Sequence, residues 1–270
     1  MPKNDDAAGS LEKLLGTLLP PENVYIPVVT KEQQLKELDI LNERISSESF
    51  YFVFNLLAFE LENIKGVGKW LGYSEKEFTV NQYLKCIHPG HAVLFNMLAH
   101  SMYKLLCKGE FKLRFSTQRY ISLVALKHYN GEYILFKKTT SVFQFDEKNR
   151  LMAQLNEFNK IELFDGSALK PRVTETEGVQ KDDFESVVFK MVLNNLMEDK
   201  YFSKREFQVL QCYAANENIT SKEVAKKLNV GDNTIDIYNK RILQKARKTF
   251  THPFVNAREV AIRLKKEKLF

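Results

Sequence analysis

In three successive segments near the carboxyl end of the chain, hydrophobic positions recur at the three- to four-residue spacing of one helix face. Polar residues occupy the positions between them, as on the exposed face of a helix. The three apolar stripes consist of Phe207, Leu210 and Ala214, then Val224 and Leu228, then Ile235, Ile242 and Ala246. Three short helices with one apolar stripe each can close a small core. The pattern therefore predicts three helices between residues 202 and 250.

Side-chain oxygens mark the starts of the first two of these helices and of one further helix. In each case a glutamate follows three residues later, which is the capping-box arrangement that satisfies free backbone donors at a helix start. The pairs are Ser203 with Glu206, Thr220 with Glu223 and Asn256 with Glu259. Residues 229–231, Asn-Val-Gly, predict a tight turn before a helix that begins near Asp232.

The helix after that turn has one polar, mostly basic face. Winding it at about 100° per residue places a set of side chains opposite its apolar stripe. The set is Asp236, Ile237, Lys240, Gln244, Arg247 and Lys248, with Arg241 at its edge. Such a face fits the major groove of DNA, which admits an α-helix. A solvated surface is the alternative interpretation.

The segments FSKREFQVL, TSKEVA and NTIDIY resemble the pattern of the LuxR-type (NarL-like) DNA-binding domain, a four-helix unit, over residues 202–260. The resemblance implies that Asp236, Ile237 and Lys240 meet base edges, and that Asn233 and Thr234 lie near the phosphates. The remaining residues of the expected DNA-contact set are Ser221, Lys222, Arg241 and Gln244.

Two positions depart from the family pattern. Asp236 stands where lysine is usual, so it either accepts a hydrogen bond from a cytosine amino group or repels the phosphate backbone. Tyr238 replaces the usual histidine, and we expect it to lie against the body of the domain.

The charge of the chain is unevenly placed and supports the DNA-binding interpretation. The whole chain of 270 residues has a net charge of +6. From residue 198 onward, 16 Lys or Arg oppose 9 Asp or Glu, which gives +7 and leaves −1 for residues 1–197. A basic module joined to a near-neutral one is typical of a DNA-binding domain attached to a regulatory domain, because phosphate neutralisation contributes much of the affinity.

The amino-terminal 45 residues predict a tail and two helices. We expect residues 1–10 to be disordered, residues 11–19 to form a short helix that stops before two prolines, and residues 31–46 to form an amphipathic helix. The last of these needs a partner surface, either the next domain or a second copy of the chain.

Residues 50–164 predict strands, then helices, then an antiparallel meander. Two strands should form a hairpin around residues 57–58, and Asn130-Gly131 should form a second hairpin turn. The expected helices are 67–71, 74–78, 81–86 and 91–107, and the later strands are 111–116, 120–128, 132–145 and 151–164.

The segments WLGYSEKEF, IHPGH and HYNGEYILF resemble a PAS sensor domain over about residues 46–165. The resemblance implies a module that binds an unknown small ligand or a protein partner. His91 stands where an acid is usual, which puts the capping role of that acid in doubt. We interpret the scattered histidines as surface or capping groups and the many aromatic residues as core, so no cofactor is predicted.

Between these modules, residues 166–197 predict a linker and a connecting helix. The linker is polar, and the helix from residue 182 has a broad apolar stripe that either docks on a domain or pairs with its copy in a dimer. The expected division is therefore 1–45 for the tail and helices, 46–165 for the PAS-like domain, 166–197 for the connection and 198–270 for the helix-turn-helix domain. The fold class is α+β, with an antiparallel sheet and helices followed by an all-α domain.

Several classes of protein are disfavoured. The three cysteines have no metal-ligand or disulfide spacing, so no metal site is predicted. The chain also has no phosphate-binding glycine loop or nucleophile motif, and we therefore do not expect it to be an enzyme. No segment approaches the ~18 apolar residues of a membrane span, and a cytoplasmic protein is expected.

These observations predict a sequence-specific transcription regulator that binds double-stranded DNA as a homodimer under the control of its amino-terminal domain. The alternative is a protein-interaction module whose carboxy-terminal helices bind a protein partner.

Overall fold

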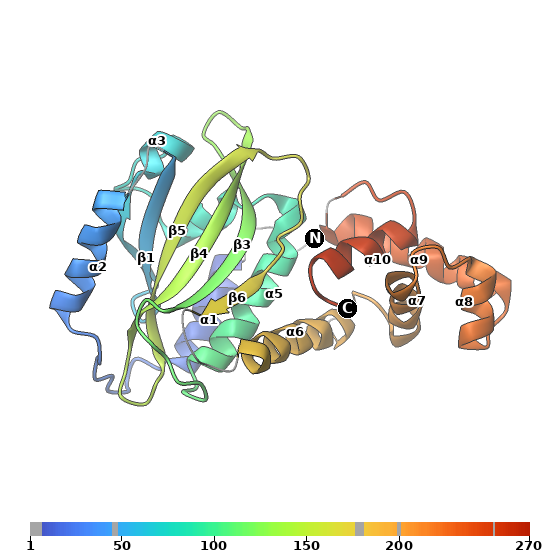
Figure 1. The fold of residues 1–270 in the computed structure, drawn as a ribbon, viewed down its shortest axis with the longest axis horizontal. Helices are drawn as coiled ribbons and strands as arrows, with labels where there is room; N and C mark the ends of the chain where they lie inside the picture. Colours follow the sequence, from blue (N-terminus) through green and yellow to red (C-terminus); the bar gives the residue numbers. More distant parts are fainter. Residues whose placement is uncertain (1–6, 45–47, 176–180, 199–200, 251) are drawn as a thin grey trace.

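The computed structural model describes residues 7–44, 48–175, 181–198, 201–250 and 252–270. It has two parts, a sheet with helices on both faces and a carboxy-terminal group of helices (Figure 1). The α+β fold class predicted from the sequence is confirmed.

The described residues form a six-stranded sheet in the order β2-β1-β5-β4-β3-β6, and neighbouring strands are antiparallel. The strands are β1 Ser49–Asn55, β2 Glu60–Lys65, β3 Gln118–Lys127, β4 Tyr133–Phe145, β5 Leu151–Leu163 and β6 Arg172–Glu175. Both predicted hairpins are present, since β1 pairs with β2 and β3 pairs with β4. The central strands β4 and β5 have 13 residues each, and most of these residues are buried or half-buried.

One face of the sheet is covered by helices that precede and interrupt the strands. They are α1 Ala7–Leu18, α3 Val67–Leu71, α4 Val80–Cys86 and α5 Pro89–Leu106. An aromatic core lies between these helices and the sheet, where the rings of Phe50 and Phe158 stack at 4.4 Å and Phe52 meets Tyr83 edge to face at 5.0 Å. The core therefore fixes α4 and α5 over strands β1 and β5.

The opposite face of the sheet is covered by α2 (Lys31–Arg44). Its Leu38 and Leu41 pack on a small apolar cluster that includes Tyr51 and Phe143 of the sheet. Of the two partners expected for this amphipathic helix, the structure supplies the neighbouring domain.

The connecting helix α6 (Lys181–Glu198) docks within the same chain. Its Val188, Val192 and Leu196 are buried in a core that also contains Leu94 of α5 and Val209 of the carboxy-terminal helices. Docking on the same chain therefore buries much of its apolar stripe, while Val187 of the predicted stripe stays exposed. This one core joins the sheet-containing part to the carboxy-terminal helices.

Four sequence-based expectations are corrected by the structure. Residues 7–10 are helical rather than disordered, because Ala8 and Leu11 pack on the core, while residues 1–6 lie outside the described ranges. Residues 74–78 form a turn instead of a helix. Residues 111–116 alternate as a strand does but form a loop, whose Phe111 meets Phe184 of α6 at 5.1 Å. The supposed linker contains β6, which completes the sheet beside β3.

Candidate nucleic-acid interface

The carboxy-terminal group consists of α7 Lys204–Ala215, α8 Ser221–Leu228, α9 Asp232–Phe250 and α10 Ala257–Lys266. Helices α7 and α8 begin with the predicted capping boxes. The Ser203 and Thr220 hydroxyl oxygens accept from the N–H groups of Glu206 and Glu223, and each glutamate accepts from the N–H of its capping residue. The starts of α7 and α8, and that of α10 at Asn256, whose side chain accepts from the Glu259 N–H, were thus readable from the sequence.

The turn between α8 and α9 depends on Asn229. Its backbone is left-handed, with φ 53°, and its N–H donates to the carbonyls of Ala225 and Lys226. Gly231 then begins α9, since its carbonyl accepts from the Thr234 N–H at 2.9 Å. Asparagine tolerates the left-handed region better than most residues, so the turn ends α8 and redirects the chain within three residues.

Helix α9 has a buried and an exposed side, as its pattern predicted. Ile235, Ile242 and Ala246 are fully buried against α7 and α8. Tyr238 is half-buried against the same core, as expected. The exposed side carries Asn233, Asp236, Ile237, Lys240, Arg241 and Gln244, which we call the reading surface.

Two predicted contact residues differ from the others because they are half-buried. The Ser221 hydroxyl lies 3.2 Å from the Tyr213 hydroxyl and 3.4 Å from the Asn239 amide nitrogen, so it ties α8 to α7 and α9. Thr234 is half-buried on the first turn of α9. Lys222 is exposed at the start of α8.

The structure also identifies Arg258, which the sequence analysis did not single out. Its guanidinium lies over the Tyr213 ring at 5.6 Å and donates to the Ile219 carbonyl at 2.6 Å. It lines a hollow of about 340 Å³ beside the reading surface, together with Lys240 and Asn256. Two cations beside one hollow suit a phosphate. The only sequence signal was the neighbouring helix cap at Asn256.

An ion pair holds α7 to α9 behind the reading surface. The Lys245 ammonium lies 2.7 Å from a carboxylate oxygen of Glu206, whose side chain is 2% exposed. Burial alone would raise the pKa of Glu206, but hydrogen bonds from Lys245 and the Ser203 N–H outweigh it and the pKa lies below its usual value. The carboxylate thus stays ionised and positions α9.

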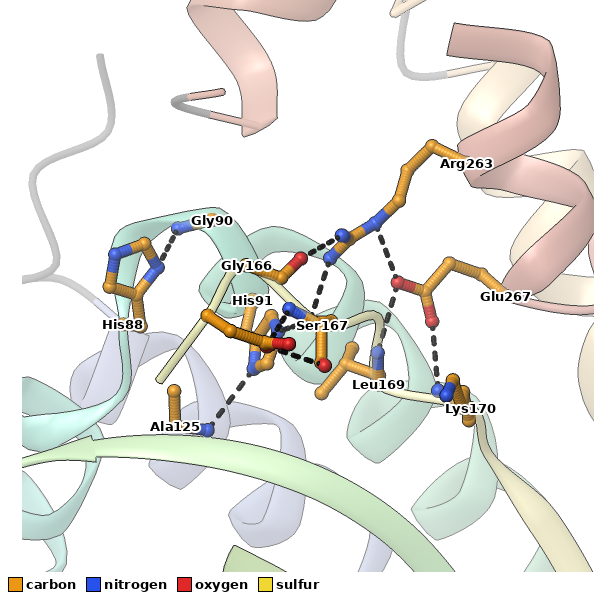
Figure 2. A network of polar contacts seen from close by, with 11 residues as sticks. His88, Gly90, His91, Ala125, Gly166, Ser167, Leu169, Lys170, Arg263 and Glu267 are labelled. Atoms are coloured by element: carbon orange, nitrogen blue, oxygen red, sulfur yellow. Dashed lines mark hydrogen bonds and ion pairs between the residues drawn. The ribbon is translucent and has the colours of Figure 1, made fainter. Parts of the chain in front are cut away.

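A second polar network docks α10 on the sheet-containing part (Figure 2). Arg263 donates to the carbonyls of Gly166 at 2.8 Å and Ser167 at 3.4 Å, and it pairs with Glu267 at 3.0 Å. Glu267 in turn accepts from the N–H groups of Leu169 at 3.0 Å and Lys170 at 3.1 Å. Burial raises the pKa of Glu267, although these partners oppose that effect.

His91 of α5 contacts this network through the carbonyl of Ser167. Its Nδ1 accepts from the Ala125 N–H at 3.2 Å, so its Nε2 carries the proton and donates to the Ser167 carbonyl at 2.7 Å. Burial lowers the pKa of His91 to about 4. His88 caps α5, with its Nδ1 accepting from the Gly90 N–H at 3.0 Å. His88 is therefore a capping group, as interpreted from the sequence. His91 is neither a surface nor a capping group, because it is fully buried inside α5 and bonds to residues 125 and 167.

No group of three or more side chains able to hold a metal ion occurs in the described part of the chain. The helices of the described ranges include none that is long and apolar enough to cross a membrane.

Residues 200–247 match the family model "Bacterial regulatory proteins, luxR family". The match covers the end of the connecting segment, α7, α8 and most of α9. No curated protein matches the chain.

Several solved structures are similar to the chain at low identity. A phage VqmA–DPO complex is 13% identical over 88% of this chain and 90% of that chain, with a TM-score of 0.31. A VqmA–ligand–DNA complex from Vibrio cholera is 10% identical over 87% of each chain, with a TM-score of 0.27. Escherichia coli SdiA is 14% identical over 97% of this chain and 98% of that chain, with a TM-score of 0.26. With scores this low, these similarities assign neither a ligand nor a partner.

Proposed function

We propose that this chain, whose residues 200–247 form a LuxR-type helix-turn-helix domain, is a sequence-specific transcription regulator that binds double-stranded DNA. The observation that carries the proposal is the reading surface. Six side chains of α9 are exposed opposite a fully buried stripe, and a tight turn at residues 229–231 precedes the helix. A helix presented in this way can enter a major groove.

Each contact residue has an expected role. Asp236, Ile237 and Lys240 lie midway along the exposed side of α9 and should meet base edges. Asn233 and Thr234, on the first turn of α9, should lie near phosphates. Lys222, Arg241 and Gln244 extend the surface on either side, and Ser221 contributes by holding α8 against α9. Direct base contacts set sequence preference, while the cations supply affinity for any DNA.

The proposal includes a homodimer on DNA. A single helix of this kind reads only a few base pairs, and two copies related by a two-fold axis can read half-sites about 34 Å apart. The proposed division of labour gives DNA binding to residues 198–270 and sensing of a ligand or partner to residues 46–165. Residues 1–45 precede the sensing part, with α1 and α2 packed on its sheet, and residues 166–197 connect the two proposed parts. The proposal also places the protein in the cytoplasm and assigns it no catalytic step.

The test is selection of bound duplexes from a random DNA pool by the full chain, at about 50 and about 200 mM salt. We expect one enriched half-site in two symmetric copies, and affinity that falls by ~10³-fold or more between the two salt concentrations. A variant with Lys240→Ala and Arg241→Ala should lose enrichment, whereas Lys76→Ala with Lys137→Ala, at exposed positions of the sheet-containing part, should not.

A pool without enrichment, together with binding that ignores salt, would overturn the proposal. The carboxy-terminal helices would then serve as a protein-binding fold, which is the alternative predicted from the sequence.

A further inference from the structure

A row of polar side chains crosses the core between the sheet and α5. Lys138 and Thr140 of β4 and Gln154 and Asn156 of β5 are all at least nine-tenths buried, although their neighbours on the same face are aromatic or aliphatic. Thr140 lies directly opposite Asn156 across the two strands. Buried polar groups in an apolar core cost free energy unless they are paired, so a row of four requires an explanation.

Lys138 is the unusual member of this row. Its side chain is 5% exposed, its ammonium donates to the Thr140 hydroxyl at 2.9 Å, and it lies 5.2 Å from the centre of the Phe95 ring. The Thr140 hydroxyl then donates to the side-chain amide oxygen Oδ1 of Asn156 at 3.0 Å. Among the described residues no carboxylate forms an ion pair with Lys138. Burial alone lowers the pKa of Lys138 to about 7.

Lys138 also lines a cavity of about 40 Å³, whose other walls include Phe52, Phe54, Tyr83 and Phe95. A second cavity of about 100 Å³ adjoins it. The two share four lining residues, namely Met102, Tyr120, Thr140 and Gln154. An apolar cavity of roughly 150 Å³ holds one benzene ring, and the two neighbouring cavities together approach that volume.

A second buried group in the same cavity lacks a partner. The Tyr83 hydroxyl is buried and makes no hydrogen bond to the rest of the described chain. Within the described ranges, two N–H groups of Lys138 and the O–H of Tyr83 therefore have no hydrogen-bond acceptor. An ammonium with spare N–H donors and a hydroxyl without an acceptor favour an oxyanion as the ligand, and the aromatic walls favour a flat apolar body.

We propose that the cavity binds a small carboxylate with a single ring or a short chain, whose oxygens accept hydrogen bonds from Lys138 and Tyr83. The apolar part of the ligand lies among Phe52, Phe54 and Phe95 and extends toward the larger cavity. This inference names the class of ligand that the proposed sensing domain binds. It rests on the proposed function only in that the ligand would regulate DNA binding; ligand binding itself does not depend on that function.

The probes are benzoate, phenylacetate and hexanoate, each compared with its neutral amide. Binding to the full chain is measured by calorimetry without DNA, so a negative result is separate from a failure of DNA binding. At least one carboxylate should bind tenfold or more tightly than its amide. Lys138→Met should remove that preference, whereas Lys137→Met should keep it, because Lys137 is the adjacent exposed residue of β4.

A second measurement covers the case in which Lys138→Met does not fold. Binding of a carboxylate near pH 7.5 should be accompanied by proton uptake, because the anion stabilises the charged form of an amine that burial holds partly neutral. Calorimetry of the unmodified chain in two buffers of different ionisation enthalpy detects this uptake. The proposal is overturned if amides bind as well as their carboxylates, or if the preference persists in Lys138→Met, or if no proton is taken up.

Discussion

Asp236 places a negative charge in the middle of a surface that should face phosphates. It is exposed between Asn233 and Lys240 on α9. An acid there can accept from a cytosine amino group in the right sequence but repels the backbone of every sequence. The residue should therefore lower general affinity and raise selectivity.

Asp236→Lys should strengthen binding to a scrambled duplex roughly tenfold at about 0.1 M salt, as one added phosphate contact would. The gain for the selected half-site should be smaller, so selectivity falls. Fluorescence anisotropy with both duplexes over a range of salt measures this. Glu77→Lys makes the same change in net charge at an exposed turn of the sheet-containing part and serves as the control. Equal gains in both variants would show that position 236 does not face DNA.

His91 makes the stability of the chain depend on pH. Its folded pKa of about 4 lies below its ordinary value of 6.5, so the folded chain keeps the ring neutral while the unfolded chain takes up a proton. The contribution of the neutral ring is complete above pH 6.5 and is lost as the pH falls from 6.5 toward about 4.

His91→Gln tests this effect, because glutamine can accept from Ala125 and donate to Ser167 but does not titrate. The difference in free energy of unfolding between the unmodified chain and the variant should shrink by roughly 2 kcal/mol between about pH 7.5 and about pH 5. Urea unfolding at the two pH values measures it. A difference that stays constant with pH would contradict the structural role given to the neutral ring.

At the level of whole elements, the helices that were predicted correctly are those marked by local sequence signals such as capping residues. Capping residues such as Ser203 and Thr220 act on the four backbone donors beside them, so their effect is visible within a few residues of sequence. The helix-turn-helix elements were located correctly for that reason. The positions of α8 and α9 and the reading surface follow from the same local signals.

Elements that depend on distant partners were harder to predict. The loop at 111–116 has the alternation of a strand, but Phe111 packs on Phe184 of α6, which is more than 70 residues away in sequence. Strand β6 is short and polar and exists because β3 offers a free edge. Lys138 could not be placed in a cavity from sequence, because a lysine in a strand is ordinarily exposed.

Glu206 tests how far one ion pair stabilises the helix-turn-helix element. Glu206→Gln removes the buried charge that Lys245 and the Ser203 N–H share, and we expect the free energy of unfolding to fall by about 1–3 kcal/mol. Glu223→Gln changes the equivalent capping residue of α8, which is exposed, and should cost clearly less. Because the folded pKa of Glu206 is lowered, its contribution should disappear as the pH falls through that pKa, below the ordinary value of 4.5. Equal losses in the two variants would show that Lys245 adds nothing.

On the scale of the whole molecule, the cavity walls and the DNA-binding helices share a structural support. Val173 of β6 and Phe184 of α6 line the larger cavity, and α6 continues into the core shared with α7 and α9. Leu169 belongs to that same core and also donates to Glu267 of α10. A ligand that moved α6 or the 166–170 segment would thus act on the placement of α10.

Arg263 is the residue that tests this placement. Its guanidinium donates to Gly166 and Ser167 and pairs with Glu267, which leaves Arg263 only 16% exposed. Arg263→Met keeps the apolar stem but leaves the buried Glu267 carboxylate without its cation, which should lower the free energy of unfolding by roughly 3 kcal/mol. Lys266→Met, on the same helix but exposed, is the control.

Release of α10 should also change the arrangement of the two parts. Small-angle scattering should give a larger radius of gyration for Arg263→Met than for Lys266→Met. The affinity of Arg263→Met for a single half-site should stay within a few-fold of that of the unmodified chain, because the reading surface lies on α9 and takes no part in the network. The preferred spacing between half-sites should broaden, since spacing depends on how rigidly each domain is held. An unchanged radius together with unchanged spacing would mean that the apolar core shared by α5, α6 and α9 holds the domains without this network.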